Sequence, residues 1–153
     1  MIFEEGFVSH KATKTRKSEN YVSEALEALA KIAVDCGYKL HEGLGPGLLE
    51  SVYEACLFAG LSERGLRVER QKPIPIRFNG VVLDEGFRID LLVENMLVIE
   101  LKSTEAFMPV HGKQVLTYLR LMDLPLGLLM NFGAPTFRQG VRRIANNYFK
   151  PMA

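Results

Sequence analysis

The chain has 153 residues, of which 48% are hydrophobic and 24% charged, and its formal net charge is +1. This length suits one domain with a substantial core and is too short for two comfortable ones. No apolar run approaches the roughly 18 to 20 residues that a membrane span requires, so we expect no membrane partner. The near-neutral charge does not by itself indicate a nucleic-acid partner.

Residues 1–18 are predicted to form a flexible basic tail, and residues 19–153 a single domain. The first 17 residues carry four basic and two acidic side chains, and such a tail can concentrate positive charge, although a solvated terminus is the simpler interpretation. The segment lacks the apolar core of a secretory signal. The two cysteines, Cys36 and Cys56, fall in helical patterns and indicate a reducing compartment, so we expect a cytoplasmic protein.

Two helices are predicted before the first strand. Apolar residues at helical spacing predict a helix over 19–40, with Ser18 as its N-cap. The glycine-rich stretch at 41–45 breaks it, and a second helix is predicted over 46–64, with Gly65 at its C-terminal cap. The glycine-rich stretch lacks the lysine of a phosphate-binding loop and follows no strand, so no nucleotide cofactor is expected.

Three antiparallel strands are predicted next, over residues 67–78, 81–93 and 97–103. Pro73 and Pro75 favour an edge strand or a bulge for the first. The Asn79-Gly80 dipeptide that follows is a strong signal for a tight hairpin turn.

A further helix is predicted over 109–122, followed by a buried, almost wholly apolar strand over 126–132. Because a helical crossover joins it to the preceding strand, this strand should run parallel to its partner. The final segment, 136–149, fits either a strand or a terminal helix. The predicted fold class is therefore α/β, a mixed sheet flanked by helices.

Three charged residues interrupt the apolar central strands: Asp90 on one, and Glu100 and Lys102 on the next. Glu100 and Lys102 are two residues apart and so share a face. A two-residue loop would place Asp90 opposite Ile99, whereas a three-residue loop at 94–96 would place it opposite Glu100. We expect the second register because it collects the apolar residues on the other face. Those residues are Ile89, Leu91, Val93, Ile99 and Leu101.

Two carboxylates held together repel each other unless a proton or a cation lies between them. Oxygen ligands suit magnesium or manganese, with water and substrate phosphate completing the shell. A lysine nearby can orient an attacking water and offset negative charge on a phosphorane. From the spacing alone, a salt-bridge ladder across the hairpin is an equally acceptable interpretation. In the next helix, Gln114 and Tyr118 are four residues apart and share a face, which by itself suits a core tyrosine with a polar rim.

Taken together, these segments resemble the bacterial GxxExxY proteins, which are named for a Gly-x-x-Glu-x-x-Tyr pattern. Residues 47–53, GLLESVY, carry the pattern, and the segments LGPG, RIDLLVE, VIELKS, QVLTYLR and GLLMNFG occur in the family's order. The likeness covers about residues 20–145. It implies a PD-(D/E)XK, restriction-endonuclease-like core of helix, three-stranded meander, helix and strand, with an extra N-terminal helix.

The resemblance also implies roles for matching residues. Asp90 corresponds to the superfamily's metal-binding aspartate, Glu100 and Lys102 to its E-x-K, Glu50 to the first-helix glutamate, and Gln114 and Tyr118 to the Q-x-x-x-Y of the recombination exonuclease branch. Some exonuclease relatives carry a cysteine-ligated iron–sulfur cluster, for which two cysteines are too few.

The first hypothesis for function is a metal-dependent phosphodiesterase that cleaves DNA or RNA. Asp90, Glu100 and the Leu101 carbonyl would hold Mg²⁺ or Mn²⁺, and Glu50 would bind through water or a second ion. Lys102 would position the nucleophilic water. On the same helix as Glu50, we expect Tyr53 to hold the helix in place and Glu54 to face solvent.

In this hypothesis Gln114 would fix Lys102 or a phosphate, and Tyr118 would pack beneath the site or touch the substrate. The arginines that would contact the nucleic-acid backbone are Arg88, Arg120, Arg138, Arg142 and Arg143. The second hypothesis is a non-catalytic nucleic-acid-binding or protein-interaction module that keeps the fold, which the weak basic charge favours. The enzyme is preferred because nothing structural requires the three charged strand residues together. An enzyme this small often gains substrate surface by dimerising, so a homodimer is a further expectation.

Overall fold

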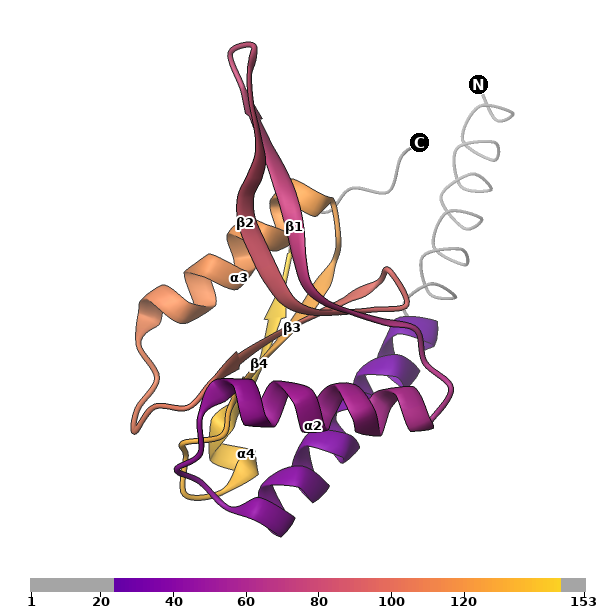
Figure 1. Cartoon of the computed structure of the whole chain (residues 1–153), viewed down its shortest axis with the longest axis vertical. Helices are drawn as coiled ribbons and strands as arrows, with labels where there is room; N and C mark the ends of the chain where they lie inside the picture. Colours follow the sequence, from indigo (N-terminus) through magenta and orange to yellow (C-terminus); the bar gives the residue numbers. More distant parts are fainter. Residues whose placement is uncertain (1–23, 147–153) are drawn as a thin grey trace, which may run out of the picture.

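A five-stranded mixed sheet with the order β1-β2-β3-β4-β5 forms the centre of the computed structural model, which describes residues 24–146 (Figure 1). The strands are β1 (Val68–Phe78), β2 (Val81–Val93), β3 (Leu97–Lys102), β4 (Leu126–Asn131) and β5 (Val141–Ala145). Strands β3 and β4 are parallel, and the other neighbouring pairs are antiparallel. The predicted parallel strand after the crossover helix and the mixed α/β sheet are thus confirmed.

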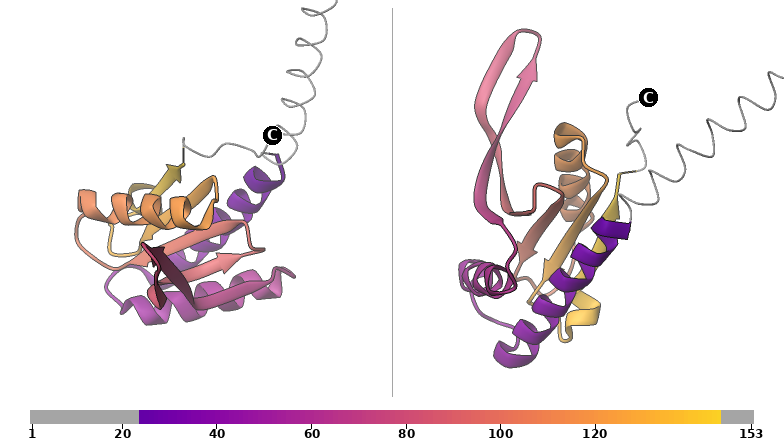
Figure 2. Two further views of the ribbon diagram at one scale, coloured as in Figure 1. Left: turned by 90° about the horizontal axis from the view of Figure 1, so that it is seen from above. Right: turned by 90° about the vertical axis from the view of Figure 1, so that its right-hand side faces the viewer.

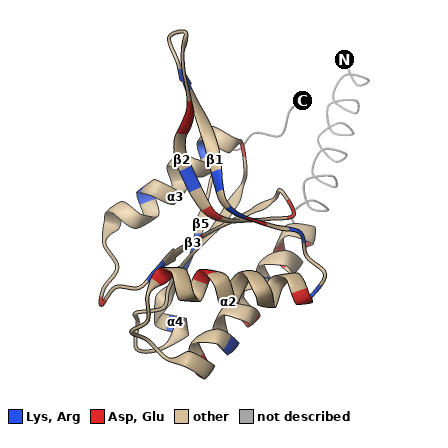
Figure 3. Ribbon diagram, viewed as in Figure 1, with Lys and Arg blue, Asp and Glu red and all other residues tan. Residues whose placement is uncertain are grey.

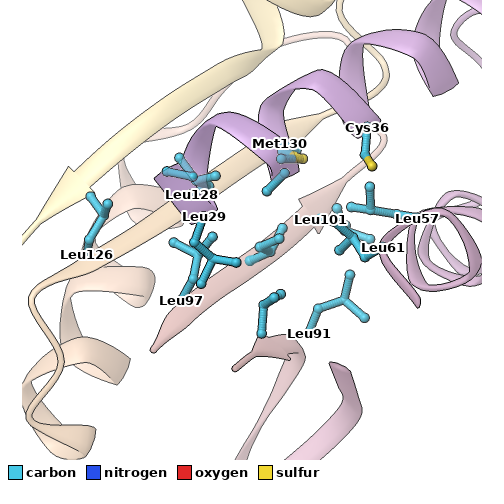
Figure 4. Close-up of a cluster of buried hydrophobic side chains, with 14 of the residues drawn as sticks. Leu29, Cys36, Leu57, Leu61, Leu91, Leu97, Leu101, Leu126, Leu128 and Met130 are labelled. Carbon is cyan, nitrogen blue, oxygen red and sulfur yellow. The ribbon is translucent and has the colours of Figure 1, made fainter. Parts of the chain in front are cut away.

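Helices cover both faces of this sheet (Figure 2). A helix over residues 24–44 and α2 (Glu50–Glu63) pack on one face, where their buried leucines join Leu91, Leu97 and Leu101 in the main core (Figure 4). Helix α3 (Pro109–Met122) packs on the opposite face. The sheet is therefore buried from both sides, as the continuous apolar run of β4 indicates. No helix within residues 24–146 is long and apolar enough to span a lipid bilayer.

The connection between the first two helices differs from the prediction. The first helix continues to residue 44 instead of ending near residue 40, and α2 begins at Glu50 instead of residue 46. Gly45 and Gly47 adopt positive φ angles of 69° and 103°, which exclude both from a right-handed helix. The predicted end of α2 is correct: the C-cap is Arg64, and Gly65 follows it with a φ angle of 82°. The predicted start of the first helix and the tail over 1–18 lie outside the described residues.

Tyr53 anchors this glycine-rich connection. It is fully buried, its hydroxyl donates to the Gly45 carbonyl at 2.5 Å, and it accepts from the Leu48 amide at 3.2 Å. Its ring stacks on Phe132 at 4.5 Å. The expectation that Tyr53 holds α2 in place agrees with these contacts.

The turn and strand predictions for β1 and β2 are confirmed. Asn79 and Gly80 form a two-residue turn with φ angles of 48° and 77°, as expected for a type I′ hairpin. Strand β1 is at the edge of the sheet, and its register with β2 shifts between Ile74 and Ile76, around Pro75. Beyond this shift the hairpin projects from the body as an arm (Figures 1 and 2).

The final segment contains both of the structures that its sequence left open. A four-residue helix, α4 (Phe137–Gly140), leads into β5, which pairs antiparallel with β4. Thr136 caps α4 by accepting a hydrogen bond from the Gln139 amide.

Candidate functional site

The hairpin between β2 and β3 has the predicted three-residue loop. Leu91 pairs with Ile99 and Val93 with Leu97, which leaves residues 94–96 as the loop. Extending this register by one residue places Asp90 opposite Glu100. The side chain of Asp90 reaches across to β3, where Oδ2 accepts a hydrogen bond of 2.8 Å from the backbone amide of Leu101.

The predicted apolar face is correct except at Ile89. Leu91, Ile99 and their neighbours pack in the main core, but Ile89 packs in the second cluster, which contains residues of α3. The strict alternation fails because the pairing of β2 with β3 ends at Leu91, and because Gln71, opposite Asp90 on β1, has a positive φ of 48°. Asp90 therefore sits at a local break in the sheet.

Glu100 is a buried carboxyl group with incomplete hydrogen bonding. It is only 5% exposed, and its Oε2 atom has no hydrogen-bond partner among the described residues. The pKa of Glu100 is raised to about 9, mainly by burial and in addition by the nearby Asp90, whereas the charge of Lys102 acts to lower it. Without a counter-charge, the site holds this group in its neutral form at pH 7.

This pair of carboxyl groups suits a divalent cation. An ion would provide the missing partner for Glu100 Oε2 and would offset the repulsion between Asp90 and Glu100. In residues 24–146, no three His, Cys, Asp or Glu side chains gather closely enough to hold a metal by themselves. Backbone oxygens, water or substrate would therefore have to complete the shell, as is usual for magnesium.

A cleft of about 550 Å³ opens between the start of α2 and the break in the sheet, and Asp90 forms part of its wall. Its polar lining also includes Glu50, Glu54, Gln71 and Ser103. Glu50 is exposed and faces the same cleft as Asp90. The Ser103 hydroxyl donates to the Leu48 carbonyl at 2.6 Å and so ties the end of β3 to the connection before α2.

The prediction that Glu54 faces solvent is wrong. Glu54 is only 7% exposed and accepts hydrogen bonds from Gln71 Nε2 at 2.7 Å and from Arg70 Nε at 3.2 Å. Residues four apart share a helix face, so Glu54 lies on the same side of α2 as Glu50. The difference between the two glutamates is that β1 supplies partners for Glu54.

The remaining predicted residues lie on the α3 side. Tyr118 is buried and stacks on Phe87 with ring centroids 4.2 Å apart. Burial raises the pKa of Tyr118 to about 12, as do the charges of Glu100 and Asp90, whereas a hydrogen bond with Gln114 acts against this. Tyr118 and Gln114 are therefore in contact with each other and close enough to the carboxyl groups to respond to their charge.

Comparison with protein families agrees with this arrangement. The family model of the PD-(D/E)XK nuclease superfamily matches residues 27–144. The chain belongs to the PD-(D/E)XK nuclease superfamily. No curated protein matches the sequence significantly.

The five arginines predicted to contact nucleic acid lie on different elements: Arg88 on β2, Arg120 on α3, Arg138 on α4, and Arg142 and Arg143 on β5. Figure 3 shows Lys and Arg distributed over several helices and strands, interspersed with Asp and Glu. Arg88 pairs with Glu85 at 3.1 Å. Arg143 forms an ion pair with Glu27, whereas Arg142 lies over the Phe107 ring at 4.6 Å. Arg142 and Arg143 are consecutive on β5 and so point to opposite faces. Arg143 and Arg138 of α4 line the same cavity, whereas Arg142 lies apart from them over Phe107.

Two polar residues that line the cleft, Gln71 and Glu54, were not predicted to belong to the candidate site. Gln71 contacts both Glu54 and Asp90, and its role depends on the strand register. The proline-rich sequence of β1 indicates a bulge but does not specify how far the register moves, so the partner of Asp90 was not predictable from it.

His41 packs inside the fold: it is buried, and its ring nitrogen lies 2.9 Å from the Ala134 carbonyl oxygen.

Proposed function

We propose that this superfamily member is a divalent-metal-dependent nuclease that hydrolyses the phosphodiester backbone of DNA or RNA. One observation carries the proposal: Asp90 and the buried, incompletely bonded Glu100 lie side by side on the central strands, two residues from Lys102. A structural role alone does not require this set, because a buried carboxyl group without a partner is costly to the fold.

Asp90 and Glu100 would hold Mg²⁺ or Mn²⁺, with the Leu101 carbonyl as a further ligand. The Asp90–Leu101 hydrogen bond supports this assignment because it fixes that part of β3 beside the aspartate. Glu50, which lines the adjoining cleft, would contribute through water or a second ion. When bound, the ion would act as a Lewis acid on the phosphate and lower the pKa of a bound water.

Lys102 would orient the nucleophilic water. Its side chain is partly buried, and within residues 24–146 its ammonium group makes no hydrogen bond or ion pair, so its three donors remain for water and substrate. Tyr118 would pack beneath the site. Because the pKa of Tyr118 is raised to about 12, its phenol keeps its proton and can donate a hydrogen bond. Gln114 would hold Tyr118 and present its amide to Lys102 or to a phosphate.

Finer assignments stay predictions. Membership of the GxxExxY family is supported by the pattern over 47–53, in which Glu50 lines the cleft and Tyr53 anchors the preceding loop. Backbone contacts are proposed for Arg88, Arg120, Arg138, Arg142 and Arg143. We also propose a basic tail over 1–18 preceding the domain, a homodimer and a cytoplasmic location.

The test is cleavage of supercoiled DNA, single-stranded DNA and RNA in Mg²⁺ or Mn²⁺. Lys102→Ala and Asp90→Asn are expected to lose roughly 100-fold or more in rate, as for removal of a group that stabilises developing charge. Asp84→Asn, an exposed aspartate elsewhere on β2, is the matched control and should cleave normally. Equal activity in all proteins would refute the assignment, and an absence of divalent binding would favour the non-catalytic module.

A further inference from the structure

We propose that Gln71 is a positioning residue, which holds the Asp90 carboxylate in the orientation that the metal site requires. This inference rests on the proposed function and concerns the same site. It arises from a single amide group placed between two carboxylates at the wall of the cleft.

The Gln71 amide connects α2 to β2. Its Nε2 atom donates to Glu54 Oε2 at 2.7 Å and to Asp90 Oδ1 at 3.1 Å. A side-chain amide nitrogen carries two hydrogens, so this geometry uses both. Since both partners are acceptors, only the orientation with nitrogen between them is favourable, and the amide separates two groups that would otherwise repel each other.

The backbone of Gln71 is also unusual. Its neighbours Arg70 and Lys72 pair regularly with Leu91 and Ile89, yet Gln71 itself has a φ of 48°. A non-glycine residue persists in this left-handed region only when its surroundings determine its conformation. Here the left-handed residue lies directly across the strand pair from Asp90, at the position from which its side chain reaches both carboxylates.

Both ends of this connection are fixed. Glu54 is buried on α2 and also accepts a hydrogen bond from Arg70 at 3.2 Å, so it does not move freely with solvent. At the other end, Asp90 Oδ2 accepts from the Leu101 amide at 2.8 Å. With one oxygen held by β3 and the other by Gln71, the plane of the Asp90 carboxylate is set relative to Glu100. Such outer contacts orient a metal ligand before the ion arrives.

Two substitutions separate this role from a general effect on folding. Gln71→Met keeps the length of the side chain and removes both donors. Gln71→Asn keeps an amide and tolerates the left-handed backbone, but it is too short to bridge both carboxylates. Gln139→Met, at an exposed glutamine on α4 whose side chain also has a hydrogen bond, is the matched control.

The measurements are the affinity for Mn²⁺ by calorimetry and the thermal unfolding of the metal-free full chain. We expect Gln71→Met to bind Mn²⁺ roughly tenfold more weakly or worse, as for loss of other outer-shell partners, with Gln71→Asn between it and the wild type. Because Glu54 and Asp90 each lose a donor, the unfolding temperatures of both variants should fall by roughly a few degrees while the proteins stay folded at the temperature of the titration, and Gln139→Met should bind normally. If Gln71→Met proves unstable, the affinity of Gln71→Asn decides the question.

The outcomes distinguish the two proposals. Wild-type Mn²⁺ affinity in both Gln71 variants would overturn the positioning role while leaving the nuclease proposal intact. A fall in the Mn²⁺ affinity of the Gln71 variants no greater than that of Gln139→Met would likewise overturn the positioning role. If the wild-type protein binds no Mn²⁺ and cleaves no nucleic acid, the proposed function fails and the inference fails with it.

Discussion

Replacing Glu100 with glutamine is expected to stabilise the metal-free protein at pH 8 and to change its stability much less at pH 5. The pKa of Glu100 is about 9 in the folded protein and near the ordinary 4.5 in the unfolded chain. Between these values the folded protein retains a proton that the unfolded chain releases. The stability that protonated Glu100 contributes is therefore fully present below pH 4.5 and is lost progressively as the pH rises towards 9.

The size of this effect follows from the pKa difference. Each pH unit within the window is worth about 1.4 kcal/mol, so the free energy of unfolding should fall by about 4 kcal/mol between pH 5 and pH 8 through Glu100 alone. Glutamine has no proton to lose, so Glu100→Gln should lack this part of the pH dependence. At pH 8, Mn²⁺ should raise the free energy of unfolding of the wild type much more than that of the variant. The ion binds the ionised Glu100 carboxylate of the folded state, which the variant lacks.

Urea denaturation at pH 5, 6, 7 and 8 with a chelator present would measure the difference between the two proteins. Other titrating groups are common to both and cancel in that difference. Glu63→Gln, at an exposed position at the end of α2, is the matched control and should run parallel to the wild type. If the curve of Glu100→Gln also runs parallel, Glu100 is not held neutral by burial, and the argument for a cation at this site loses its electrostatic basis.

Three further substitutions test the framework around the site. Tyr53→Phe removes the hydroxyl that donates to Gly45 and should cost about 1 to 2 kcal/mol in urea denaturation, with an unchanged slope. Asn131→Leu removes a side chain that is 1% exposed and that bonds both the amide and the carbonyl of Thr104; it should cost about 3 kcal/mol or more, and a cost below 1 kcal/mol would contradict the assignment. Phe78→Ser, at the exposed tip of the hairpin arm, should change the free energy of unfolding by about 0.5 kcal/mol or less, measured in the same way.

The parts of the fold that local chemistry determines could be predicted from the sequence. Asn79-Gly80 specifies its own turn, and the end of β1 and the start of β2 follow from it. The loop at 94–96 could be chosen because a one-residue slip would bury charge and expose apolar side chains, and this penalty is visible in the sequence alone. The meeting of Asp90 and Glu100 was predictable for the same reason.

Features that depend on distant partners were not predictable. Glu50 and Glu54 are both compatible with the edge of a helix, and only the packing of β1 against α2 shows that Glu54 is the buried one. The late start of α2 also depends on side-chain contacts. Ser103, at the end of β3, and Tyr53, in the first turn of α2, both form hydrogen bonds with the loop that precedes the helix. Helix propensity contains no information about such contacts.

The register shift around Pro75 combines a locally determined turn with a contact between distant residues. If the register of the Asn79-Gly80 turn continued unchanged along the hairpin, Glu69 would lie opposite Asp90 and would place a further carboxylate against Asp90 and Glu100. The shift instead brings Gln71 to that position, and Glu69 pairs with Lys72 at 2.6 Å. An amide that donates two hydrogen bonds thus takes the place of a like charge that would repel the Asp90 carboxylate. Between the pairs Ile74–Phe87 and Ile76–Leu83, β1 has one residue and β2 has three, so two extra residues of β2 determine which side chain of β1 faces Asp90.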